Sequence, residues 1–297
     1  MHIAMFGGTG YVGSALRAHL ASQRIRVSVF SPHSPSPLYP LETHVVADPW
    51  SARIEPGVFT HILDFYGVSG DAACARNPQE AAYRNVDSVR ALMHAAAGTG
   101  IDRFVYVSTA SVFDDGVQKT GNEFFENDVP RPATVYGDTK RIAENLLLSQ
   151  EKVPCTIIRH PTIYGLSPCM RWDTLMQFCV QQAKKEGVVR MFGDGSAFRP
   201  LAALSHVVAG YAHVLHSPPP SQSCFHIVSE NEPIRNYLER IQQVAKECGQ
   251  RISVETVEQS YVPSYRVHSS FPYTNRPEYS FELLQAIWKA AVGRNHL

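Results

Sequence analysis

The chain has few cysteines, and none has a spacing that would serve a metal site or a disulfide framework. Six cysteines are scattered along 297 residues, and no two of them form a C-x-x-C pair. Zinc sites and small disulfide-bonded domains both show clustered, regularly spaced cysteines. We therefore predict reduced thiols, no bound metal and a cytoplasmic protein.

Charge of one sign and long apolar runs are also lacking. The 27 Lys and Arg residues balance the 27 Asp and Glu residues, and no basic stripe runs along the chain. Such a stripe marks nucleic-acid-binding proteins, so nucleic acid is not an expected partner. No stretch of about 18 apolar residues is present, so no membrane span is expected. Because the first predicted strand begins at residue 2, we also expect no signal peptide.

What the chain does contain is a regular alternation of two kinds of segment. Short apolar runs typical of buried parallel strands alternate with helical stretches near residues 78–97 and 136–150. This alternation predicts an α/β fold with a doubly wound parallel sheet. The predicted strands are His2–Phe6, Val27–Phe30, His44–Ala47, His61–Phe65, Phe104–Ser108 and Thr156–Arg159.

Three glycines at a three-residue spacing, Gly7, Gly10 and Gly13, follow the first predicted strand. The next segment, Ser14–Leu20, has helix-forming composition with apolar residues at helical spacing. Glycine allows positive φ and a close approach of the backbone to phosphate. The helix N-terminus offers free N–H groups and a positive dipole end. The pattern predicts a cradle for a dinucleotide pyrophosphate; the alternative is a glycine-rich turn without a ligand.

A second pattern, Tyr136-x-x-x-Lys140, places a phenol and an ammonium on one helical face, because residues four apart on a helix are neighbours. A phenol with a pKa near 10 is a poor base at neutral pH. An adjacent ammonium stabilises the phenolate and lowers that pKa towards the range useful for acid–base catalysis. The alternative is a solvated pair on a helix surface.

Five segments together resemble the extended short-chain dehydrogenase/reductases, a family that includes nucleotide-sugar epimerases, dehydratases and ketoreductases. The resemblance covers most of the chain, and the order and spacing of the segments are more specific than any one of them. The segments are Gly7–Gly13, Asn85-Val86, Phe104–Phe113, Tyr136–Lys140 and Arg159–Gly165.

The resemblance implies a catalytic set of three residues. Tyr136 exchanges a proton with the substrate hydroxyl or carbonyl, and Lys140 also holds the nicotinamide ribose. Thr109, at a strand end, steadies the same substrate oxygen, although such a hydroxyl is often only structural. The chain is therefore expected to be an enzyme.

The resemblance also implies a set of cofactor contacts. Asp48 would accept a hydrogen bond from the adenine, or could instead cap a loop. Other positions also have an alternative to a cofactor contact. Phe65 could be a core residue and Asn85 could be a buried structural amide. Pro161 and Thr162 could form a plain turn. The full set is Gly7, Thr9, Gly10, Tyr11, Val12, Gly13, Ser31, His33, Asp48, Phe65, Gly67, Asn85, Lys140, Pro161 and Thr162.

Departures from the family pattern narrow the expectation. Ser31 replaces the acid that binds the adenosine ribose in NAD-preferring members, which gives a weak lean to NADP over NAD, although no arginine follows to hold the 2′-phosphate. Ala110-Ser111 replaces the Asp-Glu pair of sugar dehydratases, so dehydration is disfavoured. Ser205-His206 stands where the family has an Asp-Asp pair, and Thr162 stands where it has an asparagine of the substrate site. Both replacements weaken the expectation that the substrate is a nucleotide sugar.

The substrate is expected to be a small molecule, with a nucleotide-activated sugar as one candidate. Ser111 and Arg199 are the predicted substrate contacts, because Arg199 matches an arginine that binds the diphosphate in the family. The alternative for Arg199 is a plain surface position.

The resemblance predicts a Rossmann-type doubly wound sheet over residues 1–165, which includes the helix with Tyr136 and Lys140. Residues 166–297, where the alternation becomes irregular, are expected to form mainly a smaller C-terminal substrate-binding lobe, with some segments returning to the sheet. The helices at 78–97 and 136–150 are expected to form a homodimer through a four-helix contact.

Three functions remain open on sequence grounds. The first is an NAD(P)-dependent reductase or dehydrogenase acting on a keto or hydroxyl group. The second is a nucleotide-sugar 4-epimerase that retains NAD. The third is a non-catalytic dinucleotide sensor, which the intact Tyr136/Lys140 pair disfavours.

Overall fold

The computed structural model describes residues 1–35, 37–116, 122–218, 224–259, 262–270 and 280–291. Within these ranges, no helix has the length and apolar character needed to cross a membrane.

The core of the molecule is a parallel sheet of seven strands in the order β11-β7-β5-β4-β1-β2-β3. The chain runs from β1 outwards to β3 and then returns to the other side of β1, so the strand order reverses between β1 and β4. The predicted α/β, doubly wound parallel sheet is therefore confirmed. The strands are β1 (His2–Phe6), β2 (Arg26–Phe30), β3 (Glu42–Val45), β4 (His61–Asp64), β5 (Arg103–Thr109), β7 (Cys155–His160) and β11 (Cys224–His226).

Two strands differ from the sequence expectation. The third strand was expected over His44–Ala47 but begins at Glu42, because the Glu42 carboxylate is fixed inside the protein by Arg17. The seventh strand, β11, was not among the predicted strands. It contains three residues, too few to show an alternation of apolar and polar positions.

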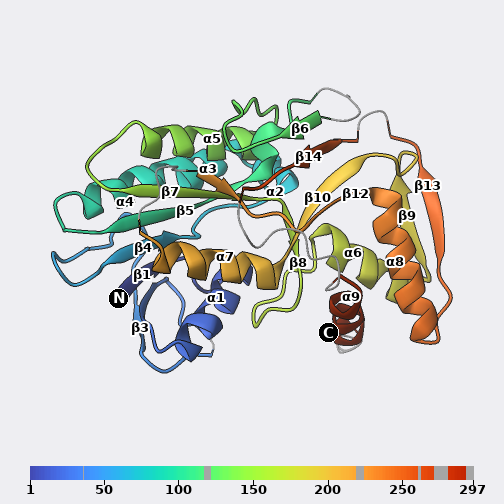
Figure 1. Cartoon of the computed structure of the whole chain (residues 1–297), viewed down its shortest axis with the longest axis horizontal. Coiled ribbons are helices and arrows are strands. Elements are labelled where there is room, and N and C mark those ends of the chain that lie inside the picture. The colour runs from blue at the N-terminus through green and yellow to red at the C-terminus, as the bar shows by residue number, and fades with distance from the viewer. Residues whose placement is uncertain (36, 117–121, 219–223, 260–261, 271–279, 292–297) are drawn as a thin grey trace.

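Helices cover both faces of this sheet (Figure 1). One face is packed against α1 (Tyr11–Ser22) and α7 (Leu204–His216), and the other against α4 (Ser88–Ala96) and α5 (Val135–Leu148). Strand residues alternate between the two cores: Ile3 points to the first and Ala4 to the second. Because both faces are buried, the strands are apolar along their length, which is the pattern seen in the sequence.

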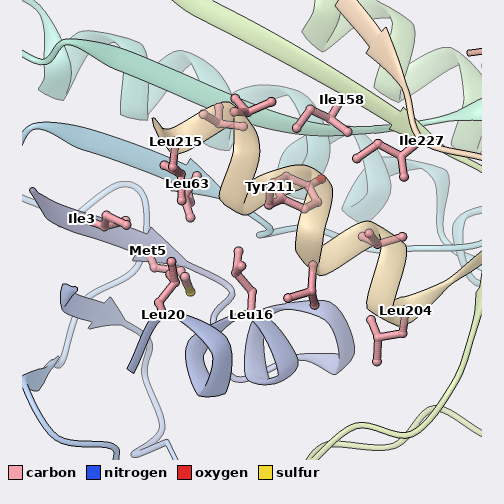
Figure 2. Packing of buried hydrophobic residues seen from close by; sticks show 14 of the residues in the cluster. Ile3, Met5, Leu16, Leu20, Leu63, Ile158, Leu204, Tyr211, Leu215 and Ile227 are labelled. Atoms are coloured by element: carbon pink, nitrogen blue, oxygen red, sulfur yellow. The ribbon is translucent and has the colours of Figure 1, made fainter. Parts of the chain in front are cut away.

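The layer between α1 and α7 is closely packed (Figure 2). Leu16 and Leu20 of α1 and Tyr211 of α7 have no solvent-exposed surface, and the Tyr211 ring lies 5.0 Å from that of Phe65. Helix α7 therefore belongs to the sheet packing, although it lies after residue 165 in the chain.

The helix expected over residues 78–97 is built from three parts. Helix α3 (Pro78–Ala82) passes into a single π-helical turn, η1 (Tyr83–Asp87), which passes into α4. The π turn contains Asn85, whose buried side chain bonds to the backbone of Val68 and to Thr139. Single π turns of this kind are frequent at functional sites.

A second apolar core lies beside the sheet, on the right of Figure 1. It contains a three-stranded sheet and a two-stranded sheet covered by three helices. We keep the division near residue 165 as a proposal, with α7 and β11 returning to the first sheet. The elements are β8 (Thr162–Tyr164), β10 (Phe198–Ala203), β12 (Glu230–Pro233), β9 (Val188–Phe192), β13 (Ser253–Val257), α6 (Leu175–Glu186), α8 (Ile234–Glu247) and α9 (Ser280–Ala290).

The remaining elements lie around the carboxyl end of β5. They are α2 (Asp71–Arg76), the 3₁₀ turn η2 (Ala110–Phe113), and a pair of short parallel strands, β6 (Asn122–Phe124) and β14 (Tyr265–Val267).

A fully buried ion pair fixes α1 against β3. The Arg17 guanidinium donates Nε and Nη2 to the two carboxylate oxygens of Glu42, and each side chain is about 1% exposed. Arg17 also donates to the backbone oxygens of Gly8 and Pro37. One side chain thus connects the glycine segment, the loop after β2 and the third strand.

Candidate active site

A cleft with a volume of about 410 Å³ lies at the carboxyl ends of the parallel strands. Gly7 follows β1, Phe65 follows β4, Thr109 ends β5 and Pro161 follows β7, and all four line it. This is the edge of the sheet, at the reversal of strand order, where ligands of open α/β folds bind. The volume is in the range of small-molecule sites.

The cleft brings together most of the predicted site residues. Those that line it are Gly7, Gly10, Tyr11, Val12, Gly13, Phe65, Gly67, Thr109, Ser111, Tyr136, Lys140, Pro161 and Thr162. Those that do not are Thr9, Ser31, His33, Asp48, Asn85 and Arg199.

The glycine turn has the geometry of an anion cradle. Gly7 has φ +70°, and a Cβ there would lie 2.5 Å from the carbonyl carbon of Phe65. A Cβ at Gly13 would lie 2.7 Å from the Cα of Gly8. Gly10 begins α1 without a side-chain cap, and the first turn of α1 holds no acidic residue. The first N–H groups of α1 therefore meet no competing carboxylate, and these residues fit a dinucleotide pyrophosphate.

Replacement of Gly7 by alanine tests this packing. We expect a loss of about 1–2 kcal/mol of unfolding free energy from the left-handed backbone, and about 1–3 kcal/mol more from the contact with Phe65. Gly57→Ala is the matched control, because Gly57 has φ +72° with nothing within 4 Å of the added Cβ. Urea denaturation measures both; equal losses in the two variants would show that the close contact has no cost.

Tyr136 is buried at the start of α5 and points into the cleft. Thr134 caps this helix by accepting from the N–H of Gly137. A Cβ at Gly137 would lie 2.7 Å from the carbonyl oxygen of Ser111, so glycine allows α5 to approach the end of β5. The helix therefore brings the Tyr136 phenol next to Thr109.

The pKa of Tyr136 is raised by burial. The largest opposing effects come from hydrogen bonding to the Ser69 and Thr109 hydroxyls and from the charge of Arg171. Lys140 was expected to lower the pKa of Tyr136, but its charge is not among the largest influences on that pKa. The electrostatic surroundings of the phenol therefore differ from the sequence expectation.

The Lys140 ammonium is turned towards the sheet. Its Nζ donates to the carbonyl oxygen of Val107 at 2.8 Å and lies 4.7 Å from the centre of the Tyr106 ring. Burial lowers the pKa of Lys140 to about 8, and the Asp64 carboxylate opposes this shift. Lys140 remains predominantly charged at pH 7, at the floor of the cleft.

Asp64 is a neighbour of Lys140 that the sequence reading missed. It is fully buried at the end of β4, beside Tyr106 of β5, and burial raises its pKa to about 6. Oδ1 accepts from the N–H of Tyr66, while Oδ2 has no partner among the described residues. The available signal was a carboxylate within the otherwise apolar run His61–Phe65.

The Asn85 side chain is a buried structural amide, which was the alternative to a cofactor contact. Its amide accepts from Val68 N–H and donates to Val68 O and to the Thr139 hydroxyl. A Cβ at Gly67 would lie 2.4 Å from Asn85 Oδ1. Asn85 therefore holds the segment after β4 against α5, and this segment forms one wall of the cleft.

The predicted adenosine contacts lie outside the cleft. The Asp48 carboxylate accepts from the backbone and hydroxyl of Ser51, which is the loop cap named as its alternative. Ser31 is buried, and its hydroxyl accepts from the N–H of the exposed His33. Thr9 is half-buried beside the glycine turn.

Arg199 is not among the residues that line the cleft. It is half-buried on β10, where its backbone pairs with Glu232, and its charge acts on the Tyr265 phenol. The structure does not bring its guanidinium together with Ser111 in the cleft lining. Its predicted contact with a diphosphate stays a prediction.

Ser69, Arg171 and Asp173 are among the cleft-lining residues that the sequence did not predict. Arg171 and Asp173 form an ion pair, with Nη2 2.9 Å from Oδ2. They lie in the loop after β8, where the sequence shows no periodicity. The only signal was an arginine two residues before an aspartate, which is too common to interpret. In the part of the chain that the structure describes, no cluster of potential metal ligands occurs.

Comparison with known proteins agrees with this arrangement. The model of the NAD dependent epimerase/dehydratase family matches residues 3–223. The Bacillus subtilis (strain 168) protein named "Uncharacterized UDP-glucose epimerase YtcB" is 26% identical over 240 residues, 73% of either chain. A 3 beta-hydroxysteroid dehydrogenase/Delta 5-->4-isomerase of Mycobacterium tuberculosis (strain CDC 1551 / Oshkosh) is 27% identical over 267 residues, 84% of this chain and 70% of that protein.

Solved structures show the same fold. MoeE5 in complex with UDP-glucuronic acid and NAD is similar over 100% of both chains, with a TM-score of 0.83 and 20% identity. UDP-glucuronic acid 4-epimerase from Bacillus cereus in complex with NAD covers 98% of this chain and 96% of its own, with a TM-score of 0.81 and 19% identity.

The lean to NADP gains no support from these findings. The expectation of NADP rested on Ser31. Its hydroxyl accepts from the backbone N–H of His33, and Ser31 does not line the cleft. Both solved structures named above contain NAD. From its strand order, its glycine turn and the match over residues 3–223, the chain belongs to the NAD dependent epimerase/dehydratase family.

Proposed function

We propose that the chain is an NAD-dependent enzyme that oxidises and reduces a secondary alcohol of a nucleotide-activated sugar, with 4-epimerisation as its reaction. The observation that supports this best is the meeting of two groups of residues in one cleft. The glycine turn at Gly7 and Gly13 and the pair Thr109 and Tyr136 line the same cavity. A non-catalytic sensor would need only the glycine turn.

The proposed cofactor site consists of cleft residues that the sequence predicts. The turn at Gly7, Gly10 and Gly13 would hold the pyrophosphate, and Lys140 would hold the nicotinamide ribose. Pro161 and Thr162 border the nicotinamide end. The bound dinucleotide supplies a hydride acceptor; the protein supplies the position and the proton transfer.

Proton transfer falls to Tyr136. The phenol takes the proton of the substrate hydroxyl as oxidation proceeds and returns it on reduction. Thr109 and Ser111 hold the reacting oxygen from the end of β5 and the turn that follows it. Ala110-Ser111 offers no carboxylate for water elimination, which favours epimerisation or ketone reduction over dehydration.

The substrate class rests on the relatives. The solved relatives named above bind UDP-glucuronic acid or act on it, and one sequence relative is named a UDP-glucose epimerase. Another sequence relative is named a 3 beta-hydroxysteroid dehydrogenase, so its name describes redox chemistry at a hydroxyl group. We favour a nucleotide sugar because the solved relatives cover the whole chain.

The cofactor that the protein retains tests the reaction. Protein purified without added nucleotide is denatured, and the released small molecules are identified by mass spectrometry. Retained NAD⁺ together with conversion of UDP-glucose to its C4 epimer supports the proposal. An empty site that takes up cofactor and releases a reduced product would replace the epimerase with the reductase.

NAD is expected to bind more tightly than NADP. The positively charged side chains among the described residues that line the cleft are Lys140 and Arg171, and both lie at its catalytic end, so neither is placed to hold a 2′-phosphate. Calorimetry with NADH and NADPH should show a preference for NADH of about tenfold or more, the scale of one unmade charge-assisted hydrogen bond. Equal or tighter NADPH binding would restore the sequence-based lean.

We also propose that the protein is a homodimer joined through α4 and α5, as the amphipathic segments at 78–97 and 136–150 predict. Light scattering at micromolar concentration is expected to give twice the mass of one chain, and a monomer would remove the proposal.

A further inference from the structure

An arginine from the second half of the chain is fixed at the mouth of the cleft. Arg171, in the loop between β8 and α6, donates Nη1 to the Ser69 hydroxyl at 2.8 Å. Its Nε and Nη2 donate to the two carboxylate oxygens of Asp173, each at 2.9 Å. Three N–H groups in fixed contacts hold this guanidinium in one orientation, which a flexible surface arginine lacks.

Ser69 connects this guanidinium to the phenol. Its hydroxyl accepts a hydrogen bond from Arg171 and lines the same cleft as Tyr136, and hydrogen bonding to Ser69 opposes the rise in the pKa of that phenol. Thr109 has the same relation to the phenol from the β5 side. The Tyr136 phenol therefore shares the cleft with two hydroxyls, and the one from Ser69 accepts a hydrogen bond from a cation.

The charge in the cleft points to the same residue. Among the described residues that line the cleft, only Lys140 and Arg171 carry a permanent positive charge. The Lys140 ammonium is engaged with the Val107 carbonyl and the Tyr106 ring. Arg171 is left as the cation on the side of the phenol that faces the cleft, and its side chain is one third exposed.

We propose that Arg171, oriented by Asp173 and hydrogen-bonded to Ser69 in the same cleft as the Tyr136 phenol, is a positioning residue for proton transfer by Tyr136. The proposal rests on the function proposed above for its role in catalysis, because Tyr136 acts there as the proton-transfer group.

The other titratable groups that line the cleft or act on the phenol are Tyr11 of α1, Tyr66 after β4, Asp71 and Cys74 of α2, Tyr106 of β5, Lys140 of α5, His160 of β7, Asp173 before α6, and Tyr211 of α7. Burial raises the pKa values of Tyr106, Tyr211 and Cys74, and lowers that of His160 to about 4, so these four are neutral at pH 7. None of the four supplies a positive charge at that pH. An opposite charge close to an ionisable group shifts its pKa by about 1–3 units.

The test follows the ionisation of Tyr136 directly. Protein labelled with 3-fluorotyrosine, whose phenol is more acidic than that of tyrosine, is titrated by fluorine NMR. The Tyr136 signal is the one missing from the Tyr136→Phe variant. In Arg171→Gln, the midpoint of this signal is expected to move to higher pH by about 1 unit or more, because a favourable charge is removed.

Two further variants separate charge from packing. Arg171→Lys keeps the charge and should retain most of the parent midpoint, whereas Ser69→Ala should move it upwards by less than Arg171→Gln. An unchanged midpoint in Arg171→Gln, or equal shifts in the glutamine and lysine variants, would overturn the proposal. Ser69→Ala removes only an exposed hydroxyl, so it provides the test if an arginine variant fails to fold.

The rate profile then connects the ionisation to catalysis. With UDP-glucose as the probe, the acidic limb of kcat/KM should move upwards in Arg171→Gln by the same amount as the NMR midpoint. A moved NMR midpoint with an unmoved limb would overturn the catalytic part of the proposal. Absence of turnover in the parent protein would count against the proposed function alone, since the NMR titration needs no substrate.

Discussion

Tyr136→Phe is expected to reduce turnover by about two orders of magnitude or more, the scale of a lost general acid–base group. The variant removes one oxygen from a phenol that lines the cleft together with Thr109 and Ser69. The ring that packs with Cys74 and Ala81 is kept, so the fold should be unchanged. Steady-state rates with UDP-glucose give the turnover, and calorimetry should show NADH binding close to that of the parent.

Tyr211→Phe is the matched control for this variant. Tyr211 is also buried, but it lies on α7 outside the cleft lining, and its hydroxyl has no partner among the described residues. Its turnover should stay within about twofold of the parent, since a surface or core change without a lost partner has a small effect. Near-parent turnover in Tyr136→Phe would end the catalytic assignment.

The second large effect concerns stability. Arg17→Met leaves the Glu42 carboxylate buried without its partner, and we expect a loss of about 3–5 kcal/mol of unfolding free energy. The methionine fills part of the space of the arginine stem, so the loss reports mainly the unpaired charge. Urea denaturation followed by circular dichroism measures it.

Two comparisons make this result specific. Arg90→Met breaks the ion pair with Asp87, in which the two side chains are 57% and 46% exposed, and should cost less than about 1 kcal/mol. In the double variant Arg17→Met/Glu42→Leu, no charge is buried, and most of the stability should return. If Arg17→Met and Arg90→Met lose the same unfolding free energy, the buried ion pair stabilises the fold no more than the exposed one.

The parts of the site that were predictable share a local cause. The glycine turn was visible because Gly7 and Gly13 face backbone atoms at distances that exclude a side chain. The pair Tyr136 and Lys140 was visible because helical spacing is a property of neighbouring residues. The strands were visible because burial on both faces makes them apolar throughout.

The parts that were missed depend on contacts between distant residues. Arg171 reaches Ser69 across 102 positions of the chain, and no local pattern announces such a pair. Asp64 was overlooked because a single carboxylate in an apolar run looks like a strand end. Asp48 and Asn85 were expected at the cofactor by resemblance; the Asp48 carboxylate accepts from Ser51 three positions away, whereas the Asn85 amide donates to Thr139 across 54 positions.

The place of α7 in the chain has a consequence for how the protein folds during synthesis. This helix covers the face of the sheet formed by strands from the first 165 residues, but it is made only at Leu204–His216. At about 5–20 residues per second, the part of that face that α1 does not cover stays exposed on the order of seconds after the last of those strands has been made. The nascent chain therefore presents an apolar surface, a binding site for chaperones, until α7 arrives.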